Sequence, residues 1–415
     1  MVRDIVRDEL DLSAILGSYT ERRGQPPYHP TMMTALLLYC CCRGIYSSRK
    51  IERACRERVD VMAVTAMATP DHDTIATFRR RHREALGGLF AQVLVLCREA
   101  GLVKLGHVAL DGTKVRANAS KHKAMSYARM SKAEREIEEE VRRWFDEAER
   151  IDADEDALYG KGRRGDEMPA WARTKAGRLK RIREAKARLE TRAKEEAERV
   201  KAEREAKEAE RGRPLTGPKP KALDGVPDDK AQSNFTDPDS RIMRTGGGYE
   251  QCYNAQAAVD TERQVIVAQS LGNQQNDVGE LLPLVDQIKD HLGAKPQEVS
   301  ADSNYCSEDN LEGLVERGVR GYVATGRQKH GTKAATSGDT RGTGARVRQM
   351  RTRLRRGGWR SRYRLRKHTV EPVFGQIKAC RGWRQVLHRG LDAVRAEWTL
   401  MCTAHNLLKL AAARA

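Results

Sequence analysis

Residues 242–325 constrain the fold of this chain most, because short apolar runs alternate there with helical patterns. A short apolar run between turn-forming residues is typical of a strand, and apolar residues spaced three and four apart are typical of a helix. Strand, helix, strand in this order is the pattern of an α/β layer. We therefore predict an α/β fold, with strands at 242, 253–259, 265–270, 298–301 and 321–325 and helices at 277–292 and 308–317.

A carboxylate ends another apolar run earlier in the chain. Residues 107–110 are followed by Asp111-Gly112, which we interpret as a strand and then a turn at Gly112-Thr113. A second strand would run through Val115 and complete a hairpin. An Asp-Gly pair is also common as a solvated turn, so Asp111 alone does not indicate a site.

Two further acids occupy similar positions. Asp302 directly follows the strand at 298–301, and Glu371 stands at the start of a helix in which Pro372 suits the first turn. Three acids from distant parts of the chain can hold a pair of divalent cations about 3.5–4 Å apart, which would cleave a phosphodiester. Oxygen ligands favour Mg²⁺ or Mn²⁺. With 58 acidic residues the chain offers many such trios, so solvated acids remain the alternative.

The chain is strongly basic, with 77 Lys and Arg against 58 Asp and Glu and a net charge of +19. This favours a polyanionic partner, nucleic acid before membrane. Residues 1–100 show helical patterns, and the predicted helix at 71–90 has an apolar face with a cationic flank suited to phosphates. A solvated surface of a helical bundle explains the flank equally well. The cations on it are Arg79, Arg80, Arg81 and Arg83.

A second basic stretch lies at 341–370, with twelve Lys and Arg and no acid, and with Trp359 and Tyr363 interleaved. A nucleic-acid contact is one interpretation and a disordered basic tail is the other.

Residues 129–211 are rich in Glu, Lys, Arg and Ala, and their apolar residues alternate four and three apart in two stretches. We predict two long helices joined by a loop that holds Gly160, Gly162, Gly165 and Pro169. Lys186 and Glu196 fall at core positions, so the seam is weak. We expect an antiparallel helical hairpin inserted in the core, followed by a linker at 212–225.

Five phrases occur in order along the chain: HVALDGTKVRANAS, NFTDPDSRIM, YNAQAAVD, VSADSNY and TVEPVFGQIK. In this order they resemble the DDE-type transposases of bacterial insertion sequences, in the group with an all-helical N-terminal domain. The resemblance runs from PPYHPTMM at residue 26 to AHNLLKL at residue 404. Relatives commonly carry some tens of residues before the segment that resembles 8–19, which implies a shortened front end here.

The resemblance implies a ribonuclease-H-like catalytic core at 101–128 and 212–415, with a helical DNA-binding and assembly domain at 1–100 and the insertion at 129–211. It implies Asp111, Asp302 and Glu371 as the catalytic and metal-binding triad, with Mg²⁺, or Mn²⁺ in its place, as two ions. The partner would be double-stranded DNA, at the terminal inverted repeats and the target, bound by a homodimer.

In this family the final acid belongs to a signature with a Tyr and an Arg before it and a Lys after it. Lys378 matches the last position, seven residues beyond Glu371 and on the same helix face, where it would steer a phosphate. Tyr363 and Arg366 resemble the other two members. Arg366 stands one residue further from Glu371 than is usual, where Lys367 is found, so either cation could make the DNA contact.

Three other functions remain open at this stage. The chain could be an inactive or truncated transposase that only binds DNA, a structural coiled-coil protein, or a host nuclease without transposition. Its nine cysteines form no CxxC pair, and no stretch approaches the length of a membrane span, so we expect a cytoplasmic, nucleoid-associated bacterial protein without a membrane partner.

Overall fold

The computed structural model describes residues 1–19, 28–159, 170–212, 214, 224–326, 334–337 and 343–414. Contacts within the chain divide it into two compact units, residues 1–118 with 243–415, and residues 119–242. The loop between the two long helices, predicted at 152–175, is shorter, because residues 152–159 and 170–175 are helical. Residues 160–169 and most of the predicted linker at 212–225 lie outside the described residues.

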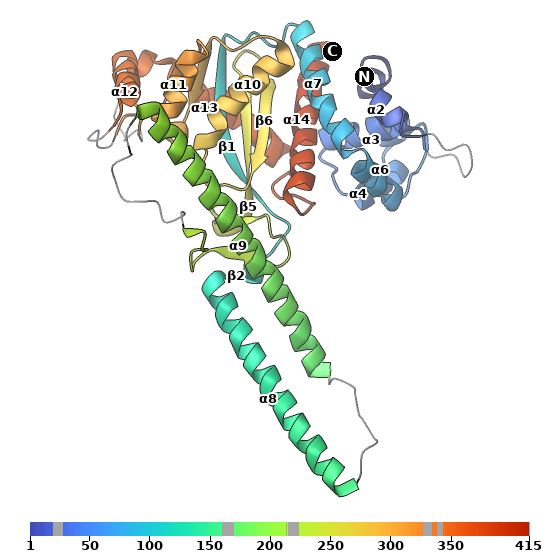
Figure 1. Cartoon of the computed structure of the whole chain (residues 1–415). Helices are drawn as coiled ribbons and strands as arrows, with labels where there is room; N and C mark the ends of the chain where they lie inside the picture. Colours follow the sequence, from blue (N-terminus) through green and yellow to red (C-terminus); the bar gives the residue numbers. More distant parts are fainter. Residues whose placement is uncertain are drawn as a thin grey trace. The chain divides into compact units, whose positions relative to one another are not determined.

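The larger unit is built on a six-stranded mixed sheet (Figure 1). Its strand order is β4-β5-β1-β7-β8, and β6 pairs with residues 254–259 of β5. β1 pairs antiparallel with β5 and β5 antiparallel with β6, whereas β7 and β8 run parallel to β1. The bounds are β1 His107–Arg116, β4 Arg241–Thr245, β5 Gly248–Asp260, β6 Ile266–Gly272, β7 Glu298–Ala301 and β8 Arg320–Val323.

Helices cover both faces of this sheet. Every residue of β5 from Gln251 to Asp260 is buried, which a sheet with one solvated face would not allow. The crossovers between parallel strands are helical, as such connections require. They are α10 Leu281–Leu292 and α11 Glu308–Glu316, and α13 Leu365–Gly375 and α14 Leu391–Arg414 also pack on the sheet. The predicted α/β pattern is confirmed, except that a 3₁₀ turn, Val278–Glu280, precedes α10.

Residues 1–100 are helical in their described part, as predicted, and Ser47 caps α4 by accepting a hydrogen bond from the Lys50 N–H. The prediction of a single helix at 71–90 is wrong, because His82 interrupts it and separates two helices. That ring is buried and lies 2.9 Å from the Tyr19 hydroxyl. The helices are α1 Val2–Asp8, α2 Ser13–Leu16, α3 Pro30–Cys42, α4 Ser48–Glu57, α5 Val59–Thr65, α6 His72–Arg81 and α7 Arg83–Glu99.

The unit at 119–242 contains two long helices, α8 Tyr127–Tyr159 and α9 Ala170–Arg211, and a two-stranded sheet of β2 Ala124–Ser126 and β3 Gln232–Asn234 (Figure 1). The helices are antiparallel, since Tyr127 bonds to Glu190 and Glu134 pairs with Lys186. Among the side chains that the structure describes, their buried core consists of Met130, Ile137, Ile182, Ala185 and Leu189. Ala185, rather than the predicted Lys186, occupies the seam.

The basic stretch near residue 350 forms a helix, α12 Ala345–Gly357. Met350 and Leu354 are buried, one turn apart, and α12 packs on β8 and α11. Arg346 pairs with Glu312 of α11. The alternative of a disordered tail is therefore wrong for residues 343–370.

Candidate active site

Asp111 lies in the middle of β1 rather than at the end of a strand. Its backbone faces Ala257 of β5, and this pairing continues without a break to Arg116. The predicted turn at Gly112-Thr113 is therefore wrong. Pairing with β5 keeps the Asp-Gly backbone extended and overrides its local preference for a turn.

Asp302 follows β7 directly, as predicted, and the sheet register brings it beside Asp111. Ala109 of β1 faces Ser300 of β7 in parallel. Asp111 is two residues after Ala109, and Asp302 is two residues after Ser300. Both acidic side chains therefore point to the same face of the sheet and lie side by side across the two strands. The parallel pairing thus unites two acids that are far apart in the sequence.

Glu371 lies inside α13 rather than at its start, and Pro372 is an interior residue of this helix. Proline has no N–H, so the carbonyl of His368, one turn earlier, loses its usual donor. The side-chain amide of Gln264 donates to that carbonyl at 3.1 Å. This contact from outside the helix makes the interior proline tolerable.

The guanidinium of Arg366 lies among the three acids. Its Nη1 is bonded to Asp111, and its Nη2 lies 4.0 Å from Glu371 Oε1. Asp302 interacts with it electrostatically. The Arg366 side chain is only 10% exposed, whereas that of Glu371 is 56% exposed. Acids from β1, from the residue after β7 and from α13 therefore surround one cation.

The electrostatics at this place favour an added cation. Burial raises the pKa of Asp111 to about 6, with Arg366 opposing and Asp302 reinforcing the rise. Burial also raises the pKa of Asp302. A divalent cation would offset the repulsion between the Asp111 and Asp302 carboxylates, and carboxylate oxygens suit Mg²⁺ or Mn²⁺. Among the described residues, no three Asp, Glu, His or Cys side chains are already arranged to hold a metal ion. Arg366 lies between Asp111 and Glu371.

Lys378 reaches β1 close to Asp111. Its Nζ donates to Thr113 Oγ1 and to the Lys114 carbonyl, both at 2.6 Å. Burial lowers its pKa to about 8. The predicted α-helical register from Glu371 to Lys378 is wrong, because α13 ends and a π-helical turn follows over Gln376–Cys380.

Tyr363 and Arg366 are neighbours, with the guanidinium carbon 6.0 Å from the centre of the tyrosine ring. Burial raises the pKa of Tyr363. Lys367 is exposed. Of the two cations that could fill the arginine position, the structure therefore brings Arg366 to the acids.

The four arginines near residue 80 divide into two kinds. Arg79 donates to the Tyr46 carbonyl and Arg81 to the Ser18 carbonyl, so both hold α6 against segments that follow or precede other helices. Arg80 is exposed and Arg83 is half-buried. Arg79, Arg80 and Arg83 line one cavity of about 190 Å³ against α14.

Two family models match the chain. One, described as Transposase DDE domain, matches residues 217–407, and the other, Transposase domain (DUF772), matches residues 2–81. The chain belongs to the DDE transposases. No curated protein and no solved structure matches it.

As a DDE transposase the chain acts on DNA, as an enzyme that cleaves DNA and transfers strands, in a family that generally uses divalent metal ions. Asp302, Glu371 and Lys378 lie inside the matched DDE domain, and Asp111 lies between the two matches. Nothing in the comparisons favours an inactive transposase. Among the described helices none is long and apolar enough to cross a membrane.

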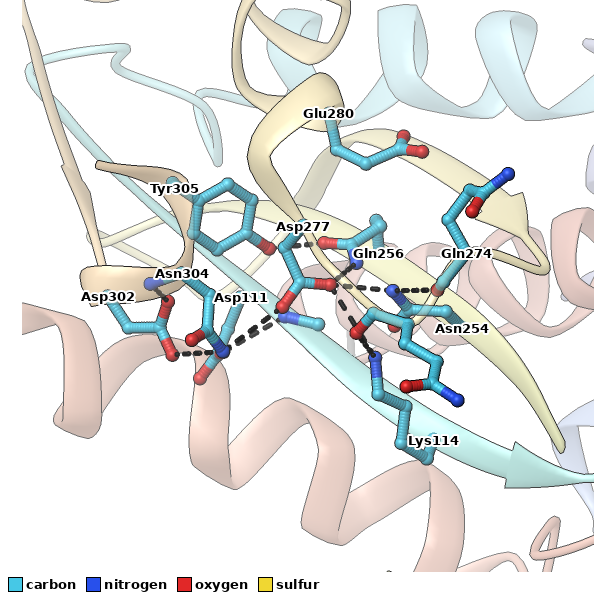
Figure 2. Close-up of polar contacts among 12 residues, drawn as sticks. Asp111, Lys114, Asn254, Gln256, Gln274, Asp277, Glu280, Asp302, Asn304 and Tyr305 are labelled. Atoms are coloured by element: carbon cyan, nitrogen blue, oxygen red, sulfur yellow. Dashed lines mark hydrogen bonds and ion pairs between the residues drawn. The ribbon is translucent and has the colours of Figure 1, made fainter. Parts of the chain in front are cut away.

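Asp277 of this transposase, which the sequence pattern predicts only to begin a helix, is a further residue near the site. The residue is buried, and it accepts hydrogen bonds from Asn254 and Gln256 of β5 (Figure 2). A signal was present in the sequence. Asn254 and Gln256 are the two amide residues in the strand predicted at 253–259 and lie two apart, so they share one face and need a buried partner.

Several conspicuous residues of the transposase are structural. His107 is buried and contacts Glu298 and Ser300. His405 is also buried, and burial lowers its pKa to about 3. Trp383 is in the core, where it stacks on Trp398 at 5.3 Å.

Proposed function

We propose that Asp111, Asp302 and Glu371 hold two divalent cations, Mg²⁺ or Mn²⁺, in a ribonuclease-H-like core. The observation that carries this proposal is the meeting of the three acids around Arg366. Bound there, the ions would activate a water or a 3′-hydroxyl and stabilise the leaving oxygen of a phosphodiester.

Arg366 and Lys378 would bind the phosphates of the reacting strand. Both cations are largely withdrawn from water, which strengthens their attraction for a phosphate oxygen. Arg366 neutralises Asp111 in the protein without DNA, and its fork can take two phosphate oxygens. Tyr363 supports the Arg366 side chain, and the exposed Lys367 would reach the DNA backbone beside it.

The helical domain at 1–100 would bind the terminal inverted repeats and assemble the protein as a homodimer. Arg80 and Arg83 would contact phosphates directly. Arg79 and Arg81 would add positive charge beside the phosphates while they stay bonded to backbone carbonyls. The insertion at 129–211 would project from the core at 101–128 and 212–415. We further propose that the enzyme works in the bacterial cytoplasm on nucleoid DNA.

The reaction would proceed without a covalent protein intermediate. Hydrolysis at each end of the insertion sequence would free a 3′-hydroxyl, and this hydroxyl would then attack target DNA. Ser303 is the serine nearest to the acids in sequence, and no His or Lys at a recognisable spacing would activate it.

The experiment that tests this function is cleavage of labelled DNA that carries the sequence flanking the gene, in Mg²⁺ and in Mn²⁺. We expect the wild type to cut at the repeat ends, Asp302→Asn to bind without cutting, and Asp309→Asn, an exposed acid on α11, to cut normally.

Two outcomes would contradict the proposal. Cutting without preference for the ends would indicate a nuclease. Binding without cutting by all three proteins would indicate a transposase that has become a DNA-binding protein.

A further inference from the structure

Asp277 is only 5% exposed, which is unusual for an acidic residue. It is not one of the three proposed metal ligands. Its Oδ1 accepts hydrogen bonds at 2.6 Å from both Asn254 Nδ2 and Gln256 Nε2, and lies 3.7 Å from Lys114 Nζ. Its Oδ2 accepts from Asn304 Nδ2 at 3.3 Å. Donors from β1, β5 and the segment after β7 therefore converge on one buried acid (Figure 2).

An ionised carboxylate only accepts hydrogen bonds, so it fixes which way each neighbouring amide points. Gln256 must turn its nitrogen to Asp277, which leaves its oxygen to accept from the Tyr305 hydroxyl. Asn304 must likewise turn its nitrogen toward Asp277. Without this acid, the orientation of Gln256 is not determined, and Asn304 keeps only Asp302 as an acceptor for its side-chain nitrogen.

The orientation of Asn304 matters because the same nitrogen also serves Asp302. Asn304 Nδ2 lies 3.4 Å from Asp302 Oδ2, and the Asn304 backbone N–H donates to Asp302 Oδ1 at 2.8 Å. An amide nitrogen carries two hydrogens, so one can point to each carboxylate. Both oxygens of Asp302 are thus held by a residue whose side chain Asp277 directs.

Gln256 and Asp277 pack closely against Gly112, the residue that follows Asp111. A Cβ atom added there would lie 2.5 Å from Gln256 Nε2 and 3.0 Å from Asp277 Oδ1. The Gly112 N–H donates to Asp111 Oδ1 at 2.9 Å. The glycine after the first acid is therefore needed for the close approach of the Asp277 network, not for a turn.

We propose that Asp277 is a positioning residue of the catalytic site, which orients Asp302 for metal binding through Asn304. This inference rests on the proposed function, because it takes Asp302 to be a metal ligand. Partners that orient a metal ligand commonly contribute about 10- to 100-fold to metal affinity.

The test is the affinity of the purified full chain for Mn²⁺, measured by the electron paramagnetic resonance signal of free Mn²⁺ without DNA. In Asp277→Asn, an amide donor faces the Asn304 nitrogen, so Asn304 turns away from Asp302 and we expect about 10- to 100-fold weaker binding. Glu280→Gln is the matched control. It removes the same charge three residues away, where the acid bonds to Ser270, and it should bind as the wild type does.

Asn304→Ala keeps the test valid if Asp277→Asn does not fold, because Asn304 is exposed and its loss leaves no cavity. It should weaken Mn²⁺ binding in the same direction at an unchanged melting temperature. The double variant of Asn304→Ala and Asp277→Asn should bind Mn²⁺ about as weakly as either single variant, because both changes break the same link from Asp277 through Asn304 to Asp302. A purely structural role for Asp277 would lower the melting temperature and leave the two effects additive.

The possible results separate the two proposals. If Asp302→Asn loses Mn²⁺ while Asp277→Asn and Asn304→Ala bind normally, the positioning role is wrong and the metal site stands. If the wild type binds no Mn²⁺, the proposed function fails and this inference fails with it.

Discussion

Mn²⁺ affinity should fall steeply below pH 6, because burial raises the pKa of Asp111 to about 6 in the metal-free protein. A metal binds only the ionised carboxylate, so protons compete with it below that pKa. About a tenth of the Asp111 carboxyls are protonated at pH 7 and about nine-tenths at pH 5, which raises the apparent dissociation constant about tenfold. An Asp with an ordinary pKa of about 3.9 would change it by less than about 10%.

Asp302 adds to this dependence in the same direction, since burial raises its pKa as well. The assay is a Mn²⁺ titration at pH 5, 6, 7 and 8 at constant ionic strength, with circular dichroism to verify the fold at each pH. Asp111→Asn provides the control, because it should bind Mn²⁺ more weakly and with a shallower pH dependence. An affinity for the wild type that stays constant between pH 5 and pH 7 would refute the reasoning.

Three substitutions test other parts of the structure. Gly112→Ala should weaken Mn²⁺ binding about as much as Asp277→Asn, because the added methyl group would lie 3.0 Å from Asp277 Oδ1 and would push that carboxylate away from Asn304. Normal binding would show that the packing there is loose. Glu397→Gln should lower the free energy of unfolding in urea by about 2–4 kcal/mol, since this buried acid accepts from the Trp383 indole and from neighbouring N–H groups. Asp392 is on the same helix and its side chain is 84% exposed, so Asp392→Asn should change the free energy of unfolding by less than about 0.5 kcal/mol. Equal losses of stability in the two variants would contradict the buried role of Glu397. Lys378→Met should slow cleavage about 100-fold or more through the loss of a phosphate contact, far more than Lys367→Met, and similar rates for the two would rule out that role.

Local patterns predicted the parts of the site that depend on neighbours in the chain. The strand at 298–301 and the position of Asp302 after it are confirmed, because an apolar run between turn-forming residues decides them. The hydrogen bonds that order Asp302 also come from close by, from the backbone and side chain of Asn304. The roles of the triad and the domain boundaries stay predictions.

Features that depend on distant partners could not be predicted. The Asp111-Gly112 pair is a turn signal by itself, and only pairing with β5 keeps it in a strand. Pro372 resembles a first-turn proline, and only a donor from Gln264 allows it inside α13. Asp277 resembles the start of a helix. Asn254 and Gln256 signal that a buried partner exists but not which one, because Asp277 lies more than 20 residues away from both in the sequence.

The central claim, that the three acids form one metal site, is tested most directly by iron-mediated cleavage of the protein itself. Fe²⁺ takes oxygen ligands as Mn²⁺ does, and with ascorbate and peroxide it cuts the chain next to where it is bound. We expect cuts near residues 111, 302 and 371 that disappear with excess Mg²⁺ and in Asp302→Asn. Cuts at other places, or the same cuts in Asp302→Asn, would contradict the claim.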